Sequence, residues 1–241
     1  KPPQPCEFRS KPAWQRLIIM LGGVFVNFLL GILIYIMITF VWGVDVVKPT
    51  DIKYGFAVHD TFKELGFQDG DKLMKFDDEV PLDATDINKH LFLRDLSTVE
   101  VLHENGASET INIPEDIGST MWDQGVMEPF TVRFIAVIDS IRENSPAAKA
   151  GMLKNDQVIA VNSVPVTYWY EFSDKVLSSE GPMAITLLRS GSEITLEVIP
   201  EADNRIGVYP TPGDAIVVQK KNYTFSESIS KGNDLAFWTL K

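Results

Sequence analysis

The sequence contains one cysteine, Cys6, and only three histidines, His59, His90 and His103. A single cysteine excludes an internal disulfide framework and a cysteine-rich zinc site. Three scattered histidines leave few candidates for metal ligands or general bases. Basic residues are also in the minority, with 22 Lys and Arg against 33 Asp and Glu and a net charge of −11. An acidic chain lacks the basic surface of nucleic-acid-binding proteins, so we expect no nucleic-acid partner.

The chain also lacks a recognisable set of catalytic residues. His103 and Glu104 begin like the zinc motif His-Glu-x-x-His, but Ala107 stands where the second histidine is needed. The surrounding pattern is that of strand and turn, which predicts a solvated hairpin for both residues. No Gly-x-Ser-x-Gly elbow is present, and no histidine lies near Cys6 in the sequence. We therefore expect no catalytic residue and no metal ligand here. A further acidic cluster is predicted to be a solvated turn: Asp77, Asp78 and Glu79.

One long apolar run is present. Leu17 to Val41 is 25 residues without a charge, which is long enough for a helix to cross about 30 Å of hydrocarbon. A secretory signal peptide would have an apolar core of about 7–15 residues and a small-residue cleavage site. This run is longer and ends in bulky side chains at Val41 and Trp42. We predict a transmembrane helix over residues 17–42.

The charges beside this run indicate its orientation. Residues 1–16 carry four basic residues and one acid, whereas the charges just after Trp42 are mixed. The positive-inside rule then predicts a cytoplasmic flank at 1–16, with the following residues on the other side of the membrane.

Gly23, Asn27 and Gly31 are spaced at i, i+4 and i+8 and so share one face of the predicted helix. Two glycines and an amide on one stripe allow close approach of another helix, with an interhelical hydrogen bond worth roughly 0.6–2 kcal/mol. Alternatively, Asn27 bonds carbonyls of its own helix and the glycines are incidental. Because no second apolar run of membrane length exists in the sequence, the first interpretation requires a partner from further sequence or another chain.

The remainder contains an internal repeat. Residues 65–81 align with 150–165 and residues 98–114 align with 184–200, at an offset of 84–86 throughout. A constant offset of this size indicates a domain duplicated in tandem rather than a short solenoid repeat.

The second copy predicts its elements clearly. Ser145 suits a helix N-cap and Gly151 a left-handed helix end. A strand with an Asn162-Ser163 turn follows, then an amphipathic helix beginning near Trp169. A hairpin turns at Ser190-Gly191. These elements predict a small, partly open β-barrel or sandwich.

The stretch "ENSPAAKAGMLKNDQVIAVNSVPV" (143–166) resembles the signature of bacterial PDZ domains, with Asn155 in place of the usual glycine. We therefore expect a membrane-anchored α+β protein, in which one transmembrane helix precedes two PDZ-like domains at 50–125 and 126–208. The resemblance implies that a peptide adds a strand to an open sheet edge, in a groove beside the strand near Phe134–Ile138 and the helix near Glu171–Leu177. No glycine-rich carboxylate loop precedes the candidate strand, so folded spacers or a scaffold remain alternatives. The groove is expected at these residues: Phe134, Ile135, Val137, Phe172 and Val176.

The run "FRSKPAWQRLIIMLGG" (8–23) resembles the second transmembrane helix of RseP-type site-2 proteases. Their usual Ala-Gly-Pro-x-x-Asn-Phe is here Gly22 to Phe28, with Val24 in place of proline. Residues 222–241 resemble the amphipathic lead-in to that family's third membrane helix.

This resemblance implies part of a zinc metalloprotease that cleaves transmembrane protein substrates during regulated intramembrane proteolysis. Gly23 and Asn27 would face the active site, and the PDZ-like pair would filter substrates outside the cytoplasm. The family's zinc motifs are absent, so this sequence is expected to be an inactive fragment without zinc, completed by catalytic helices elsewhere. Its expected place is the bacterial inner membrane, in a multi-pass protein.

Two other classes of protein share some of these features. A non-catalytic, membrane-anchored PDZ scaffold explains the helix and the modules but not the Trp-Gln-Arg run or the small-polar stripe. A membrane-anchored serine protease requires a trypsin-like domain before the PDZ copies, for which the sequence has no room.

Overall fold

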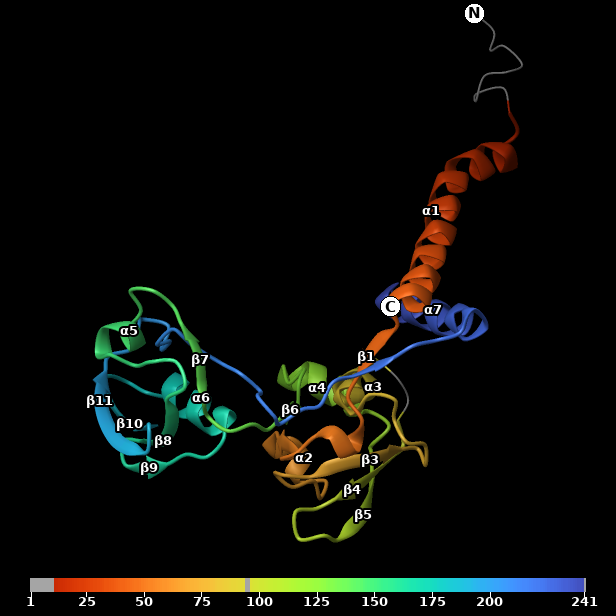
Figure 1. Cartoon of the computed structure of the whole chain (residues 1–241). Helices are drawn as coiled ribbons and strands as arrows, with labels where there is room; N and C mark the ends of the chain where they lie inside the picture. Colours follow the sequence, from red (N-terminus) through yellow and green to blue (C-terminus); the bar gives the residue numbers. More distant parts are fainter. Residues whose placement is uncertain (1–10, 94–95, 241) are drawn as a thin grey trace, which may run out of the picture. The chain divides into compact units, whose positions relative to one another are not determined.

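The computed structural model describes residues 11–93 and 96–240, and for residues 238–240 it describes the backbone alone. The chain divides into two compact units (Figure 1). The helical unit joins the two ends of the chain, residues up to 46 and from 219 onward, and the sheet unit holds residues 47–218. Cys6 and most of the predicted cytoplasmic flank lie outside the described residues.

The helical unit is built on α1, Ala13–Trp42, a helix of 30 residues. Pro12 precedes it, and the Pro12 carbonyl accepts the first hydrogen bonds of the helix. Gly43 ends it with a φ of +69°, a conformation that favours glycine. By length and composition α1 is the one described helix able to cross a membrane, and its apolar side chains are exposed. It ends at the residue predicted for the span and begins four residues earlier.

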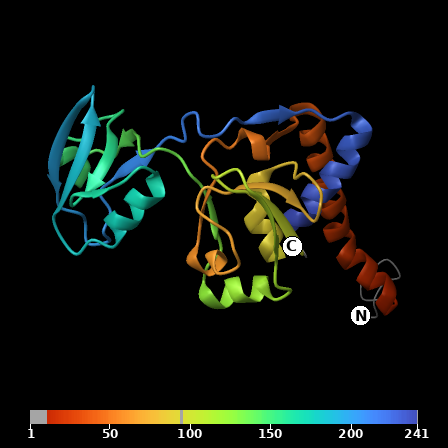
Figure 2. The same cartoon turned by 90° about the horizontal axis from the view of Figure 1, so that it is seen from below.

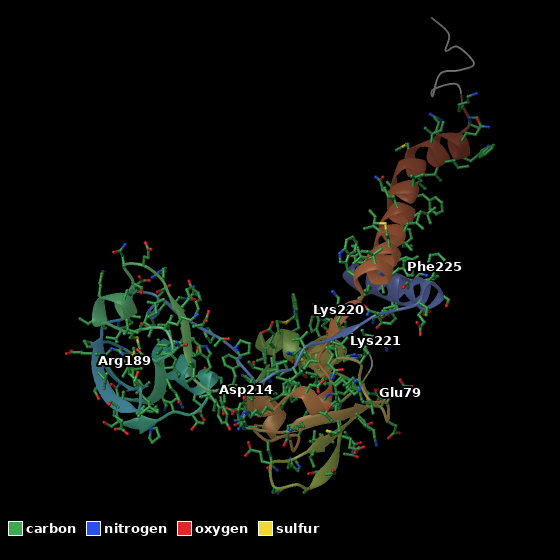
Figure 3. The ribbon with its side chains drawn as sticks, in the orientation of Figure 1. Glu79, Arg189, Asp214, Lys220, Lys221 and Phe225 are labelled. Carbon is green, nitrogen blue, oxygen red and sulfur yellow. The ribbon has the colours of Figure 1, made fainter. Side chains whose placement is uncertain are left out.

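A second helix packs on α1 within the same unit. α7, Phe225–Leu240, lies against the last turns of α1, and Figure 3 labels Phe225 at its start. A Cβ on Gly232 would lie 2.6 Å from the Ile36 Cα, so this glycine allows the two backbones to approach. The Phe40 and Phe225 rings meet edge to face at 5.7 Å. The segment predicted as an amphipathic lead-in therefore contains a helix fixed to the end of α1. The strand that follows α1, β1 (Val44–Val46), pairs antiparallel with the strand that precedes α7, β13 (Gln219–Lys221).

The sheet unit contains two separate hydrophobic cores. The first module, residues 47–132, surrounds a core that includes Phe56, Phe62, Leu73 and Phe130. Its sheets are antiparallel, with β3, β4 and β5 in one and β2 and β6 in the other. Short three-ten turns occupy Pro49–Asp51 and Ala84–Asp86. The regular elements are β2 Phe56–Val58, α2 Asp60–Lys63, β3 Lys72–Phe76, α3 Ile87–Leu93, β4 Thr98–Leu102, β5 Ser108–Asn112, α4 Ile117–Gln124 and β6 Phe130–Val132.

The second module, residues 133–210, has its own core around Phe172, Ile185 and Leu187. Its main sheet has the strand order β11-β10-β8-β9, and β7 pairs with β12. Figure 2 shows β10 and β11 side by side as one long hairpin. The elements are β7 Ile138–Ile141, α5 Pro146–Ala150, β8 Gln157–Val161, β9 Val164–Pro165, α6 Trp169–Leu177, β10 Met183–Arg189, β11 Ser192–Val198 and β12 Val208–Pro210.

The local predictions for this module are confirmed. Ser145 caps α5 by accepting the Ala148 N–H at 3.2 Å, and Gly151 ends that helix with φ +83°. Ser190 and Gly191 both have positive φ at the tip of the β10–β11 hairpin. Asn155 has φ +68°, which explains why the PDZ signature has glycine at this position.

Two structural findings differ from the sequence analysis. β6 pairs with β2 along Phe130–Val132, so the first module continues past the predicted boundary at residue 125. The strand expected near Phe134–Ile138 is not continuous, which corrects that prediction. Ile135 bridges to Tyr168 and Val137 to Gln157, because the chain crosses here from one pairing partner to another.

Candidate functional site

The stripe on α1 presents an open surface. A Cβ built on Gly23 or on Gly31 meets nothing within 4 Å. The Asn27 side chain is exposed, and among the residues that the structure describes no hydrogen bond reaches its amide. In hydrocarbon an unpaired amide is costly, so this face is suited to receive a polar or closely packed partner.

α7 shows how α1 accepts a helix at close range. It uses Gly232 against Ile36, further along α1 than the stripe. The surface formed by Gly23, Asn27 and Gly31 is therefore still available when α7 is in place.

A groove of about 350 Å³ lies in the second module between α6 and the segment that leads into β12. Phe172 and Val176 line it from α6, as the sequence predicted for these two side chains, and both are buried. Ile206, Gly207 and Val208 line the opposite wall. The groove therefore has an apolar floor beside the backbone of a short strand, which is the form that strand-adding peptide sites take.

The other three predicted groove residues lie elsewhere. Phe134, Ile135 and Val137 are not among the residues that line the cavity. Phe134 instead stacks on Trp169 with the ring planes 17° apart, and its carbonyl accepts the Trp169 N–H at 2.9 Å. Phe134 and Ile135 therefore contact the start of α6, and Val137 bridges to Gln157 at the start of β8.

The sequence pattern did not predict the loop before β12, because this loop lies far in sequence from the strand near Phe134–Ile138. Gly207 has φ +78°, and a Cβ there would lie 2.5 Å from the Ser145 Cβ. The position therefore requires glycine. Arg142 lines the same groove and pairs with Glu201. The signal that could have found this loop is the short segment Arg205-Ile206-Gly207-Val208 after the last predicted hairpin.

The histidines occupy three separate environments. The His59 ring accepts the Thr61 N–H at 3.4 Å at the start of α2, and the His90 ring packs on Phe76. His103 is only 6% exposed, so the solvated hairpin predicted for it is wrong. The ring points into the module because its Nδ1 lies 2.6 Å from Oδ1 of the buried Asp71 carboxylate.

Within the described ranges, no three His, Cys, Asp or Glu side chains gather in a way that could hold a metal ion. The residues present do not fit a catalytic zinc centre, which needs three protein ligands and an open position. We therefore assign no zinc-dependent step to them.

The acidic turn is solvated, as predicted. Asp77, Asp78 and Glu79 are exposed, and the Asp77 carboxylate accepts the N–H groups of Ser97 and Thr98 at 2.9 and 2.8 Å. Its role is to hold the start of β4.

Several known proteins resemble this chain. Regulator of sigma-E protease RseP of Escherichia coli is 26% identical over 206 residues, covering 81% of this chain and 45% of that protein. A Neisseria meningitidis protein named as a zinc metalloprotease, NMA0084, is 25% identical over 228 residues, covering 88% and 50%. The chain thus spans about half the length of the curated relatives it matches.

Among solved structures, the HtrA3 PDZ domain bound to a phage-derived ligand is 24% identical, with a TM-score of 0.27 over 32% of this chain and 73% of that one. The model of peptidase family M50 matches residues 2–232, nearly the whole chain. This match confirms the resemblance that the Trp-Gln-Arg run and the Asn27 stripe indicated: the chain belongs to peptidase family M50, the site-2 proteases.

Proposed function

We propose that this chain is the regulatory and substrate-contacting part of an intramembrane zinc metalloprotease that cleaves transmembrane proteins. The observation that carries the proposal is the family match over residues 2–232. The zinc ligands and the catalytic glutamate belong to sequence outside this chain, and the chain alone is inactive.

The open face of α1 supports a contact with the catalytic helices. Gly23 and Gly31 leave room for a backbone, and the Asn27 amide offers two donors and an acceptor between them. An extended substrate segment next to a protease active site needs hydrogen-bond partners, because no water is available inside the bilayer. Asn27 is suited to supply one, either to the substrate or to the neighbouring helix.

Asn27→Leu is expected to reduce cleavage of a membrane-spanning substrate by the complete protein about 3- to 30-fold, since an interhelical hydrogen bond is worth roughly 0.6–2 kcal/mol. Substrate cleavage is followed in membranes by gel analysis of a tagged substrate at matched enzyme level. Phe25→Leu is the matched control, because it introduces the same side chain on the opposite side of α1. Unchanged cleavage in Asn27→Leu would remove the substrate-facing role of this residue.

We further propose that the two modules form a tandem PDZ-like filter on the extracytoplasmic side of the membrane. The groove of the second module supports this, since Phe172 and Val176 provide an apolar floor beside the β12 backbone. Residues 47–218 hold 14 Lys and Arg against 29 Asp and Glu, and this excess of negative charge keeps such modules away from anionic headgroups and accessible to soluble domains of a substrate.

Ser173→Trp is expected to fill the groove and to change the selectivity of the complete protein at least fivefold. Ser173 lines the cavity, so an indole there occupies the space of a peptide side chain. The measurement is the ratio of cleavage rates for one transmembrane substrate with and without its outer folded domain. Asp174→Trp is the matched control, because Asp174 is exposed and does not line the groove. If both variants keep the wild-type ratio, this groove is not the filter.

A non-catalytic membrane-anchored scaffold is the alternative, and the same groove favours it. The two functions separate on the Asn27 experiment, because a scaffold has no cleavage for that substitution to reduce.

A further inference from the structure

Each module contains one buried carboxylate that ties a turn to the end of a strand. In the second module, Asp156 is 1% exposed and its Oδ2 accepts the Leu153 N–H at 2.8 Å. In the first module, Asp71 is fully buried and its Oδ2 accepts the Gln68 N–H at 2.8 Å. The two carboxylates are therefore equivalent by sequence repeat and by hydrogen bonding.

The cationic partner differs between the copies. The Asp156 carboxylate accepts two hydrogen bonds from the Arg189 guanidinium, one from Nε and one from Nη2, at 2.7 Å each. Figure 3 labels Arg189 in the second module, at the end of β10. In the first module the Asp71 carboxylate instead lies 2.6 Å from Nδ1 of His103, a residue just beyond the end of β4. His103 thus stands in the place of Arg189.

Both ring nitrogens of His103 face a carboxylate. Nδ1 meets Asp71, and Nε2 lies 3.2 Å from the Glu109 Oε2 on β5. A neutral imidazole has one donor nitrogen and one acceptor nitrogen, so it leaves a lone pair facing one of these anions. Only the doubly protonated ring donates to both.

Among the residues that the structure describes, the hydrogen-bonding partners of the His103 ring are Asp71 and Glu109. The carboxylate of Glu104, the next residue, accepts a hydrogen bond from Nη2 of Arg133 at 2.7 Å. From β3, Lys72 lies opposite Leu102, one position away in the ladder. Asp71, supported by Glu109, raises the pKa of His103 above 6.5, against the opposing effect of burial. Arginine in the second module remains charged at every physiological pH.

We propose that His103 makes the first module a proton-responsive element, in which the Gln68–Asp71 turn is held firmly when the ring is doubly protonated and loosens when it loses a proton. In the second module Arg189 occupies the equivalent position and holds the equivalent turn. That turn does not respond to physiological pH, because the arginine stays charged. The switch concerns the folding of the first module and is independent of whether the modules filter substrates.

The direction of the response follows from linkage. A group whose pKa is raised by folding stabilises the folded state below its unfolded pKa, and this contribution is lost as the pH rises through the folded pKa. The window for His103 therefore begins near pH 6.5 and extends upward. For Asp156, burial raises the pKa but the Arg189 and Leu153 hydrogen bonds outweigh it and hold the pKa below 3.8, so that connection is lost only as the pH falls below this value.

The test is hydrogen exchange of the whole chain in detergent micelles between pH 5.5 and 8.5. Peptides covering 66–73 and 151–158 report the two equivalent turns in one molecule, and the ratio of their protection factors is compared after correction for intrinsic exchange. We expect the ratio of first to second to fall about tenfold for each unit by which folding raises the pKa of His103.

Two variants, each carrying the other module's residue at the equivalent position, test whether His103 causes the pH response. In His103→Arg the ratio is expected to stay constant with pH, and in Arg189→His the second turn is expected to acquire the response. A ratio that stays constant in the unmodified chain overturns the proposal, and this measurement stands even when a variant does not fold. A response that persists unchanged in a folded His103→Arg variant also overturns it, because the titrating group then lies elsewhere.

Discussion

Replacing Gly55 by alanine is expected to destabilise the first module by about 3 kcal/mol or more. Gly55 has φ +66°, and a Cβ there would lie 2.0 Å from the Gly70 carbonyl oxygen. The three nearest atoms, the Gly70 carbonyl oxygen and carbon and the Asp71 carbonyl oxygen, all belong to the backbone, so no side chain can move aside to make room. Relief requires separating the two strands of backbone that are joined by the Phe56 N–H to the Asp71 carbonyl at 2.9 Å and the Gly70 N–H to the Phe56 carbonyl at 2.7 Å.

The effect is measured as the change in the free energy of unfolding, from urea titrations followed by hydrogen exchange of β3–β5 in the whole chain. Gly106→Ala is the matched control, since Gly106 also has positive φ, +84°, but a Cβ there meets nothing within 4 Å. It is expected to cost about 1 kcal/mol, the backbone term alone. Equal losses in the two variants would show that the close approach of Gly55 to Gly70 is not what fixes this position.

What the sequence could predict in this molecule is mainly local. The cap at Ser145, the helix end at Gly151 and the turn at Ser190-Gly191 depend on residues within a few positions of each other. The apolar stretch that forms α1 is likewise local, because length and composition decide it.

The features that escaped prediction depend on distant pairing. β6 closes the first module by pairing with β2, more than seventy positions away, so the module boundary could not be read near residue 125. The groove of the second module is completed by Gly207, which follows the last hairpin and has no neighbouring periodicity. Phe134 has the apolar character of a groove residue, but its ring packs on Trp169 instead.

For His103, the sequence contains a local signal and a long-range signal that favour different environments. The Asn105-Gly106 turn beside it favours a solvated hairpin, and local reasoning led to that prediction. The internal repeat, however, aligns His103 with Arg189 at an offset of 86 and Asp71 with Asp156 at an offset of 85. Because the repeat aligns two residues that can carry a positive charge and also aligns two acids, it indicates the same kind of buried acid–base pair in both copies.

The second prediction with a large expected effect concerns the equivalent pair in the second module, Asp156 and Arg189. Asp156→Asn is expected to lower the free energy of unfolding by about 2–4 kcal/mol, because it removes a charge that compensates a partly buried guanidinium and places amide hydrogens against the Arg189 donors. The Asp156 side chain is 1% exposed and that of Arg189 is 26% exposed. The arginine also donates to the Gly151 carbonyl at 2.8 Å, so the loss reaches the end of α5.

Asp139→Asn provides the comparison within the same module. Its carboxylate pairs with Lys154 at 2.7 Å, but both side chains are well exposed, at 43% and 63%. An ion pair of this kind contributes about 0–1 kcal/mol, since water screens the charges and competes for the hydrogen bonds. Urea unfolding of the two variants, followed by exchange of β8 and β10, therefore compares a buried bidentate pair with an exposed pair that has the same closest N–O distance of 2.7 Å. If Asp139→Asn costs as much as Asp156→Asn, then burial does not set the strength of these connections, and the argument that the buried His103 pair controls the first module loses its energetic basis.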